Sequence, residues 1–474
     1  MVLLAICCIP PVSAREPGRG GHDQQASNVF QVAVPAHPFD IILARPETNA
    51  ITCSILAYQD IEGLMAYGMQ PGVYARQSPV QVFKKDVPCE LAIDGLQANA
   101  RYFYQFRFRS PGTATFTNSP EYTFHTARPA GGNFTFTMTA DAHLDEPTTP
   151  EVYRQTLANI RADQPDFHID LGNLFMTDKH ATRDEAACQY LAQRYYLGLI
   201  GPSVPLFLAL GTHDGESARY DDGSEKSLSV WSTRMRTRYF PNPVPDAFYC
   251  GNTAPKPYCG LPQNYYAWEW GDALFVVLDP FGHSTQAQGS RDGWGWSLGL
   301  TQYQWLAQTL AQSHARFKFV LIHNLLCGDQ AARGGVEVAA GNEWGGKNAD
   351  NSEGFREHRP GWDAPVHALL VRNHVAAVFK AHDNFYARQE LDGIVYLMVP
   401  QPSFAGNDRI RDLDAYGYKR GTFIGNSGHV RVTVSPEQVR IEYIRSGQPQ
   451  NGTEPCKNGV TSDNCTIKPP DGGK

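Results

Sequence analysis

Apolar and polar side chains alternate in several short segments near the start of the chain. The segments 51–58, 79–83 and 101–108 show a period of two residues, with turn-forming residues between them. A period of two is typical of strands that bury one face. Several such strands within residues 36–128 predict a β-sandwich, and we find no catalytic pattern in it.

The pattern changes after the small and turn-forming residues 126–132. Apolar runs follow, and helical segments fit between several of them, as at 152–160, 301–313 and 362–372. The strand-like runs are 134–138, 167–171, 204–210, 273–278, 317–322, 375–379, 429–434 and 438–443. This alternation of strands and helices predicts a layered α/β domain over residues 132–446, followed by a C-terminal tail at 447–474.

Side chains that can bind a metal ion or a proton follow five of these strands. They are Asp141 with His143, Asn173, Thr212 with His213 and Asp214, His323 with Asn324, and His382 with Asp383 and Asn384. A single His at a strand end is usually a hydrogen-bonded structural residue, but five polar strand ends are hard to ascribe to packing. Because ligand sites in α/β sheets lie beyond the carboxyl ends of the strands, we expect one common polar site.

Length and charge narrow the class of protein. At 474 residues the chain is too long for one ordinary core, and its 42% hydrophobic and 11% aromatic content is that of a globular protein. A net charge of −7 and the absence of a basic run give no reason to expect nucleic-acid binding. No apolar stretch reaches the roughly 18 residues of a transmembrane segment.

The first residues indicate export. Residues 1–9 form a short apolar run and Val12-Ser13-Ala14 is a small-residue cleavage pattern, although the usual basic residues are missing. We therefore predict a signal peptide at 1–14, a linker at 15–35 and a secreted or extracytoplasmic protein. Three glycosylation sequons, at Asn133, Asn451 and Asn464, fit a glycoprotein of a eukaryotic secretory host.

The cysteine count agrees with export. Of the 10 cysteines two lie in the predicted signal peptide, and the remaining even number suggests disulfide bonds. The suggested local pairs are Cys53–Cys89, Cys250–Cys259 and Cys456–Cys465, which leave Cys188–Cys327. Spacing alone does not prove these pairs, and none of the spacings is that of a zinc site.

The strand-end residues resemble the calcineurin-like metallophosphoesterases in order and spacing, where the blocks read D-x-H, G-D, G-N-H-[DE], H and G-H-x-H. The first domain resembles the fibronectin type III-like N-terminal domain of purple acid phosphatases, and Leu96 with Tyr102 resembles a tyrosine corner. The resemblance covers residues 36–445. It implies a layered α/β/β/α domain in which two metal ions activate a hydroxide against a phosphate ester.

The resemblance also implies roles for single residues. Asp141 and His143 match ligands of the first metal, and His323 and His382 match ligands of the second. His213 matches the histidine that protonates the leaving group, and Asp214 would orient it. The cofactor would be one or two divalent metal ions, with Fe, Mn, Zn and Ca not distinguished. The substrate would be a small-molecule phosphate ester or a phosphorylated macromolecule.

Four positions depart from the family pattern. Asn173 stands where the bridging Asp is expected, Thr212 where an Asn ligand is expected, Ala381 where Gly is expected and Asn384 where the last His is expected. A neutral amide cannot bridge two cations as a carboxylate does. A tyrosine that gives purple acid phosphatases their colour is replaced by Met176.

The departures leave three functions open. The chain could be a metal-dependent phosphoesterase of reduced activity, in which Asp145, Asp170 or Asp383 restores the lost charge. It could be a pseudoenzyme that serves as a binding or structural extracellular protein. It could also be a hydrolase with an altered metal or substrate preference. Lys347 or Arg359 could clamp a phosphate, or could belong to a surface loop closed on its own aromatic residues.

Overall fold

The computed structural model describes residues 29–145, 148–285, 293–328, 332–404, 410, 413–425, 427–447 and 458–469. The predicted signal peptide at 1–14, the start of the predicted linker, Asn451 and Cys456 lie outside these residues. Among the described helices, none is both long and apolar enough to cross a membrane.

Two antiparallel sheets form the first domain, which confirms the predicted β-sandwich. The first sheet has the order β1-β2-β6, with β1 (Phe39–Ala44), β2 (Ile51–Ala57) and β6 (Cys89–Ile93). The second has the order β4-β3-β7-β8, with β4 (Arg76–Gln77), β3 (Ile61–Gly68), β7 (Arg101–Arg109) and β8 (Thr117–Asn118); β5 (Gln81–Phe83) pairs with β3 and β9 (Tyr122–His125) with β7. The hydroxyl of Tyr102 accepts a hydrogen bond from the backbone N–H of Gln97, as in a tyrosine corner.

Two larger sheets and their helices form the second domain, which confirms the predicted layered α/β fold. One sheet has the order β12-β11-β10-β21-β22-β23, with β12 (Leu206–Leu208), β11 (Phe167–Asp170), β10 (Phe134–Thr139), β21 (Gly428–Val434), β22 (Val439–Arg445) and β23 (Thr461–Ile467). The other has the order β13-β14-β15-β16-β17-β19-β18-β20, with β13 (Cys250–Gly251), β14 (Tyr266–Trp270), β15 (Ala273–Val277), β16 (Phe317–Leu321), β17 (Ala377–Lys380), β19 (Ile394–Met398), β18 (Tyr386–Leu391) and β20 (Thr422–Ile424).

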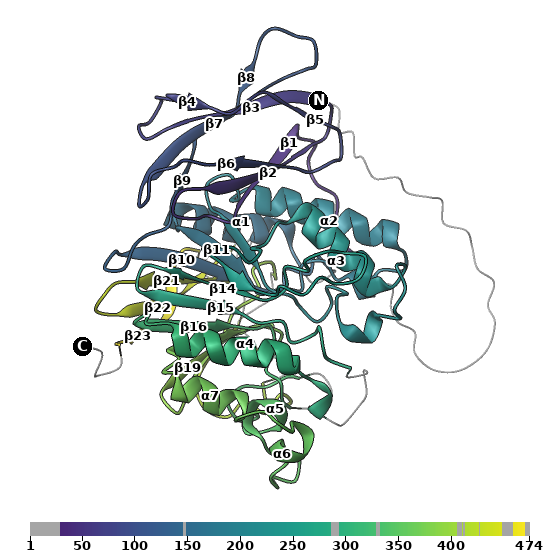
Figure 1. Ribbon diagram of the computed structural model, residues 1–474, viewed down its shortest axis with the longest axis vertical. Coiled ribbons are helices and arrows are strands. Elements are labelled where there is room, and N and C mark those ends of the chain that lie inside the picture. The colour runs from purple at the N-terminus through teal and green to yellow at the C-terminus, as the bar shows by residue number, and fades with distance from the viewer. Residues whose placement is uncertain are drawn as a thin grey trace, which may run out of the picture.

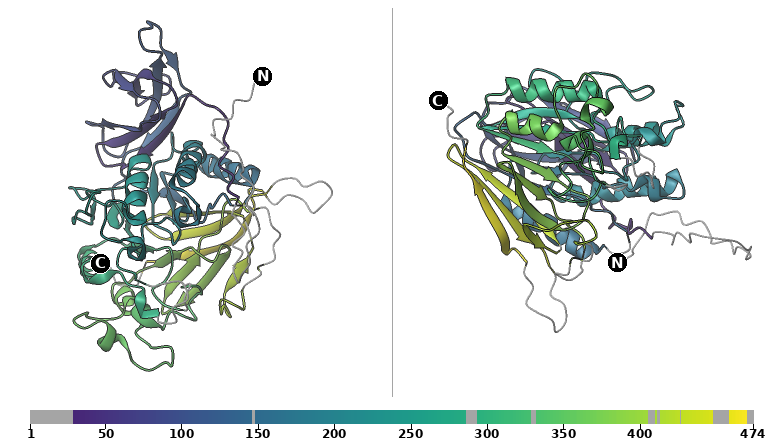
Figure 2. Two further views of the ribbon diagram at one scale, coloured as in Figure 1. Left: turned by 90° about the vertical axis from the view of Figure 1, so that its right-hand side faces the viewer. Right: turned by 90° about the horizontal axis from the view of Figure 1, so that it is seen from below.

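The two sheets pack face to face through aromatic residues. Phe136 and Phe167 of the first sheet contact Phe275 of the second, with ring centroids 5.0 and 5.2 Å apart. Helices α1 (Pro150–Asp163), α2 (Arg183–Gly198) and α3 (Leu228–Tyr239) cover the outer face of the first sheet. Helices α4 (Gly299–Gln312), α5 (Asn342–Gly345), α6 (Phe355–His358) and α7 (Val366–Arg372) cover the second (Figures 1 and 2). The layers are therefore α/β/β/α.

The C-terminal segment differs from the prediction of a tail, because part of it forms β23 at the edge of the first sheet. Its sequence is mostly polar, so that periodicity did not reveal it. Asp463 on β23 accepts hydrogen bonds from Tyr386 and Arg388 of β18 in the other sheet. These tertiary contacts link the edge of one sheet to the other.

A buried arginine joins the sandwich to the second domain. Arg194 of α2 is 0% exposed and donates to the hydroxyl and carbonyl of Ser54 and to the carbonyls of Asp40 and Tyr239. The chain comes close enough here that a Cβ at Gly198 would lie 2.9 Å from Asp40 Oδ1. The guanidinium thus satisfies carbonyl groups of β1, β2 and α3 at a tight interface.

Replacement of Arg194 by methionine is expected to lower the free energy of unfolding by about 3 kcal/mol or more, since several buried acceptors lose their donor. Thermal denaturation measures the effect. Arg154→Met on the surface of α1, where the arginine pairs only with exposed Glu151, is the matched control and should change stability by less than about 0.5 kcal/mol. Equal melting temperatures for the two variants would contradict this prediction.

The predicted disulfide pairs are not formed among the described cysteines, where Cys53, Cys89, Cys250, Cys259 and Cys327 are thiols. Cys53 pairs with Leu91 across β2 and β6, and Cys89 pairs with Ile55, so the two cysteines are diagonal neighbours. Diagonal Cα atoms lie about 7–8 Å apart, which is too far for a disulfide. Cys327 is buried in the core beneath α4 and α7, so the Cys188–Cys327 pair is also wrong. The fourth pair includes Cys456, outside the described residues.

Candidate functional site

The strand-end residues predicted to form one site converge between the two sheets. Asp141 follows β10, and its Oδ1 lies 3.4 Å from His143 Nε2 and 3.9 Å from Nε2 of His323, which follows β16 of the other sheet. Its Oδ2 accepts the backbone N–H of His382, after β17, at 2.9 Å. The rings of His323 and His382 are 5.2 Å apart between centroids. Side chains from both sheets therefore surround one buried carboxylate.

Asp141 and His143 form an ion pair. Burial by itself would raise the pKa of Asp141, but His143, His323 and the His382 amide hold that pKa below its ordinary value. Burial by itself would lower the pKa of His143, but Asp141 and Asp145 raise it to about 9. In this arrangement the positive charge next to Asp141 belongs to an imidazolium.

Asn173 uses both ends of its amide within the protein. Its Nδ2 donates to Asp141 Oδ1 at 2.9 Å, and its Oδ1 accepts the backbone N–H of His213 at 2.8 Å. The side chain is 2% exposed. An N–H group therefore points at Asp141 where a bridging ligand would need a lone pair.

Two glycines allow the loop of Asn173 to touch the loop of His213. Gly172 has a φ of 95°, and a Cβ there would lie 2.3 Å from the backbone nitrogen of Gly211. A Cβ at Gly211 would lie 2.0 Å from the nitrogen of Asn173. Any larger residue at either position would separate the two loops, so these glycines are required by space.

His213 is oriented by a different carboxylate from the predicted one. Its Nδ1 donates to both oxygens of Asp178 at 3.1 Å, and Tyr220 donates its hydroxyl hydrogen to the same carboxylate at 2.8 Å. Asp214 instead accepts the backbone N–H groups of Asn173, Phe175 and Gly211. The predicted role of Asp214 is therefore wrong: its carboxylate holds the loops together.

The sequence pattern missed Asp178 because it lies on the short 3₁₀ helix Thr177–Lys179 and not at a strand end. Burial lowers the pKa of His213, and the contact with Asp178 opposes this effect only in part. Burial would raise the pKa of Asp178, but His213 and Tyr220 lower it overall. A neutral imidazole beside a carboxylate is thus the expected state of this pair.

The residues matched to the second metal are neutral and only partly bonded. His323 donates its Nδ1 hydrogen to the carbonyl of Leu171 at 2.7 Å, while its Nε2 is buried without a hydrogen-bond partner among the described residues. Burial lowers the pKa of His323 to about 4. Thr212 Oγ1 lies 3.4 Å from His382 Nδ1, and Asn384 Oδ1 is a second buried atom without a described partner.

Two of the carboxylates that could have restored the lost charge are used elsewhere. Asp170 accepts hydrogen bonds from the backbone of Gly172 and the hydroxyl of Thr139. Asp383 lies against Lys380 at 3.2 Å and accepts the hydroxyl hydrogen of Tyr418 at 2.6 Å. Asp145 lies 3.5 Å from Nδ1 of His143 and so pairs with the imidazole. Neither Asp170 nor Asp383 replaces the bridging ligand.

The cations proposed as phosphate clamps belong to structural contacts. Arg359 pairs with buried Glu343 and donates to the carbonyls of Trp294 and Trp296 at 2.8 and 3.0 Å. Lys347 pairs with exposed Glu353. The alternative of a loop closed on its own aromatic residues therefore describes this region.

The donor set does not fit the two metal ions that the resemblance implies. Among the described residues, no three His, Cys, Asp or Glu side chains are grouped as ligands of one ion. At the bridging position the Asn173 amide directs hydrogens, not lone pairs, at Asp141. Two dications would share one anionic side chain, which leaves most of their charge uncompensated.

Comparisons with known proteins identify the fold. No family model and no curated protein matches the chain. A solved structure of PhoD superposes with a TM-score of 0.64 at 14% identity, covering 95% of this chain and 92% of that one. The purple acid phosphatase PPD1 from yellow lupin (Lupinus luteus) seeds superposes with a TM-score of 0.59 at 15% identity, covering 90% of this chain and 74% of that one. The chain therefore has the metallophosphoesterase fold, with an N-terminal β-sandwich in front of the two-sheet α/β domain.

Proposed function

We propose that this protein is a catalytically degenerate member of the metallophosphoesterase fold, which uses its strand-end site for binding and not for two-metal hydrolysis of a phosphate ester. The observation that carries the proposal is the orientation of Asn173. Its amide donates to Asp141 and accepts from the His213 backbone, so that both polar atoms are engaged without a metal ion.

The surrounding contacts support the same conclusion. The His143 imidazole lies beside Asp141 where a cation would be expected, and Asp214 ties the loops of Asn173 and Gly211 together. Hydrogen bonds thus perform the structural task that metal ions would perform in a dinuclear site. The chain should fold fully without metal.

A hydrolase that holds one metal ion is the second candidate. His323 favours it, because its Nδ1 is fixed by the Leu171 carbonyl while its buried Nε2 has no described partner. A backbone carbonyl on one nitrogen is the usual way to orient an imidazole whose other nitrogen binds a metal. His143, His382 and Asn384 would have to move to complete such a site.

Metal analysis of protein that has never met a chelator tests the proposal. We expect less than about one tightly bound divalent ion per chain, no change of melting temperature with EDTA, and no turnover of p-nitrophenyl phosphate with Mn, Zn, Fe or Ca. Two stoichiometric ions would contradict the proposal. One ion that is lost in His323→Gln but kept in the exposed control His314→Gln would establish the second candidate.

We also propose that the protein is exported, on the strength of residues 1–14 alone. Mass spectrometry of the protein recovered outside the producing cell should give an N-terminus close to Arg15. Recovery of the uncleaved chain from the cell interior would count against export. The thiol state of the described cysteines lends no support to this proposal.

A further inference from the structure

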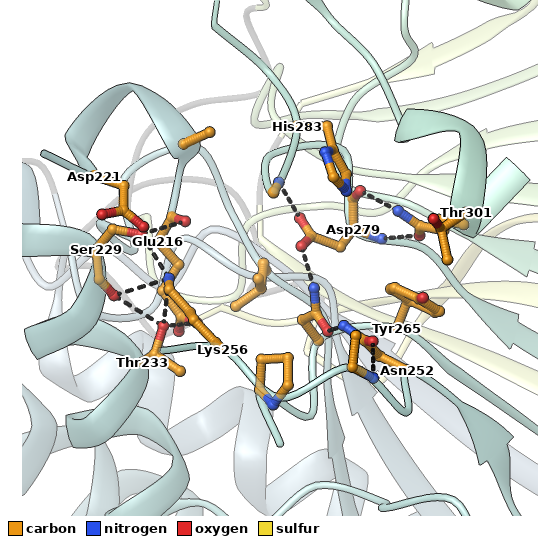
Figure 3. Close-up of a pocket in the computed structure, with 17 residues that line it drawn as sticks. Glu216, Asp221, Ser229, Thr233, Asn252, Lys256, Tyr265, Asp279, His283 and Thr301 are labelled. Carbon is orange, nitrogen blue, oxygen red and sulfur yellow. Dashed lines mark hydrogen bonds between the residues drawn. The ribbon is translucent and has the colours of Figure 1, made fainter. Parts of the chain in front are cut away.

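A second cavity lies beside the candidate site and is separate from it. Its volume is about 310 Å³, at the lower end of the range for small-molecule sites. Leu210 and Glu216 line it from either side of the loop that carries His213, while α3, α4 and the segment 252–265 supply the other walls (Figure 3). None of the residues matched to metal ligands lines it.

One wall is a rigid network around Glu216. The Glu216 carboxylate accepts two hydrogen bonds from Arg236 of α3, at 2.6 and 2.9 Å, and one from the hydroxyl of Thr233. Lys256 crosses from the opposite segment and donates to the hydroxyls of Ser229 and Thr233 at 2.7 and 3.1 Å (Figure 3). The charge of Glu216 is thus balanced by an arginine, and this wall is preorganised.

The opposite wall presents the buried carboxylate of Asp279, at the end of β15. Its Oδ1 accepts the backbone N–H groups of Phe281 and Gly282, and its Oδ2 accepts one hydrogen from Asn264. A carboxylate oxygen has two lone pairs, so Oδ2 keeps room for a second donor.

Gly282 opens this oxygen to the cavity. A Cβ at Gly282 would lie 2.8 Å from Asp279 Oδ2, in the space through which the oxygen faces the cavity. The backbone of Gly282 is outside the positive-φ region, so no turn geometry requires glycine there. The absent side chain therefore leaves a space next to a strong acceptor.

The remaining lining groups can both donate and accept hydrogen bonds. They include the hydroxyls of Thr301 and Tyr265 and the ring of His283, all of which border the cavity in Figure 3. The Tyr265 ring is held by Trp305, with centroids 4.9 Å apart, and Pro262 and Leu210 add small apolar areas. A ligand that suits this wall must offer donors and acceptors on several sides and a modest apolar face.

From this geometry we infer that the cavity is a binding site for a small neutral polyhydroxylated molecule of about monosaccharide size. One of its hydroxyls donates to Asp279 Oδ2, others exchange hydrogen bonds with Thr301 and Tyr265, and its C–H face lies on the apolar part of the wall. This inference goes beyond the proposed function and does not depend on it.

Other classes of ligand suit the wall less well. An anion would meet Asp279 and Asp221, which have no ion pair among the described residues, while Lys256 is already committed to hydroxyls. An apolar ligand would leave the polar groups of the wall without water, which costs about 1–3 kcal/mol for each unpaired group. A cationic ligand would pair with Asp279 but would also approach Lys256 across the cavity.

Isothermal titration calorimetry of the full chain with glucose, galactose, mannose and glycerol tests the inference, with glucuronate and glucosamine as the anionic and cationic probes. We expect at least one neutral probe to bind with a Kd below about 10 mM. We expect Ala254→Trp, which fills the cavity from its exposed rim, and Thr301→Val to weaken that binding at least tenfold.

The matched controls lie away from the cavity. Ala114→Trp changes an exposed residue of the sandwich, and Thr309→Val changes a hydroxyl two turns further along α4; neither should alter binding. The inference is overturned if no neutral probe binds, if only glucuronate or only glucosamine binds, or if the cavity variants bind as tightly as their controls. The outcome is independent of metal content, so failure here leaves the proposed function standing.

Discussion

A variant that combines Asn173→Asp, Thr212→Asn and Asn384→His is expected to become metal-dependent in both stability and activity. In chelator the introduced carboxylate at position 173 lies where an amide now donates to Asp141 at 2.9 Å, so a hydrogen bond becomes a repulsion between two acceptors. A pKa shift of about two units for the coupled carboxylates corresponds to a loss of about 3 kcal/mol.

The sign of the pH dependence follows from the raised pKa of that pair. The folded variant binds more protons than the unfolded chain, so the destabilisation is present above the raised pKa and is relieved as the pH falls through it. Excess Mn²⁺ or Zn²⁺ should reverse the loss, because a cation between the carboxylates converts repulsion into attraction.

Melting temperatures with EDTA and with metal, together with turnover of p-nitrophenyl phosphate, measure these effects. Because even an outer-shell partner affects metal sites about 10–100-fold, we expect the restored ligands to raise metal-dependent turnover more than about 100-fold. Asn118→Asp on the exposed strand β8 is the matched control and should show neither effect. A variant whose stability ignores metal would show that the substitutions are not what prevents metal binding.

Arg236→Met is expected to lower the melting temperature by roughly 10 °C. The side chains of Arg236 and Glu216 are 1% and 4% exposed, so removal of the cation leaves a buried carboxylate unpaired at a cost of about 3–5 kcal/mol. The pair links α3 to the segment that follows His213, so differential scanning calorimetry should show a destabilised second domain.

The neighbouring Arg234 on the same helix provides the control. It pairs with Glu225 on the surface, with side chains 44% and 59% exposed, and Arg234→Met should change stability by less than about 0.5 kcal/mol. Adding Glu216→Gln to Arg236→Met removes the stranded charge and should recover much of the loss. If Arg236→Met melts like Arg234→Met, the buried pair has no structural importance.

Local pattern determined most of the architecture. Period-two segments such as β7 and apolar runs such as β10 and β16 are visible because one face or both faces of each strand must be apolar to be buried. The positions of Asp141, His143 and His323 after their strands were likewise predictable, since the carboxyl ends of strands share an edge. The exception was β23, an edge strand whose polar sequence carries no such period.

Only the tertiary structure decided what the polar residues contact. Asp178 rather than Asp214 meets His213, and Asp170 and Asp383 turn to partners of their own, because hydrogen bonds reach across loops that are distant in the chain.

The substitution at position 173 shows the division most clearly. The sequence by itself showed that a bridging carboxylate is replaced by an amide; the folded structure decided that the amide hydrogens point at Asp141. Residue type follows from the sequence, whereas the direction of a donor depends on every group that packs around it.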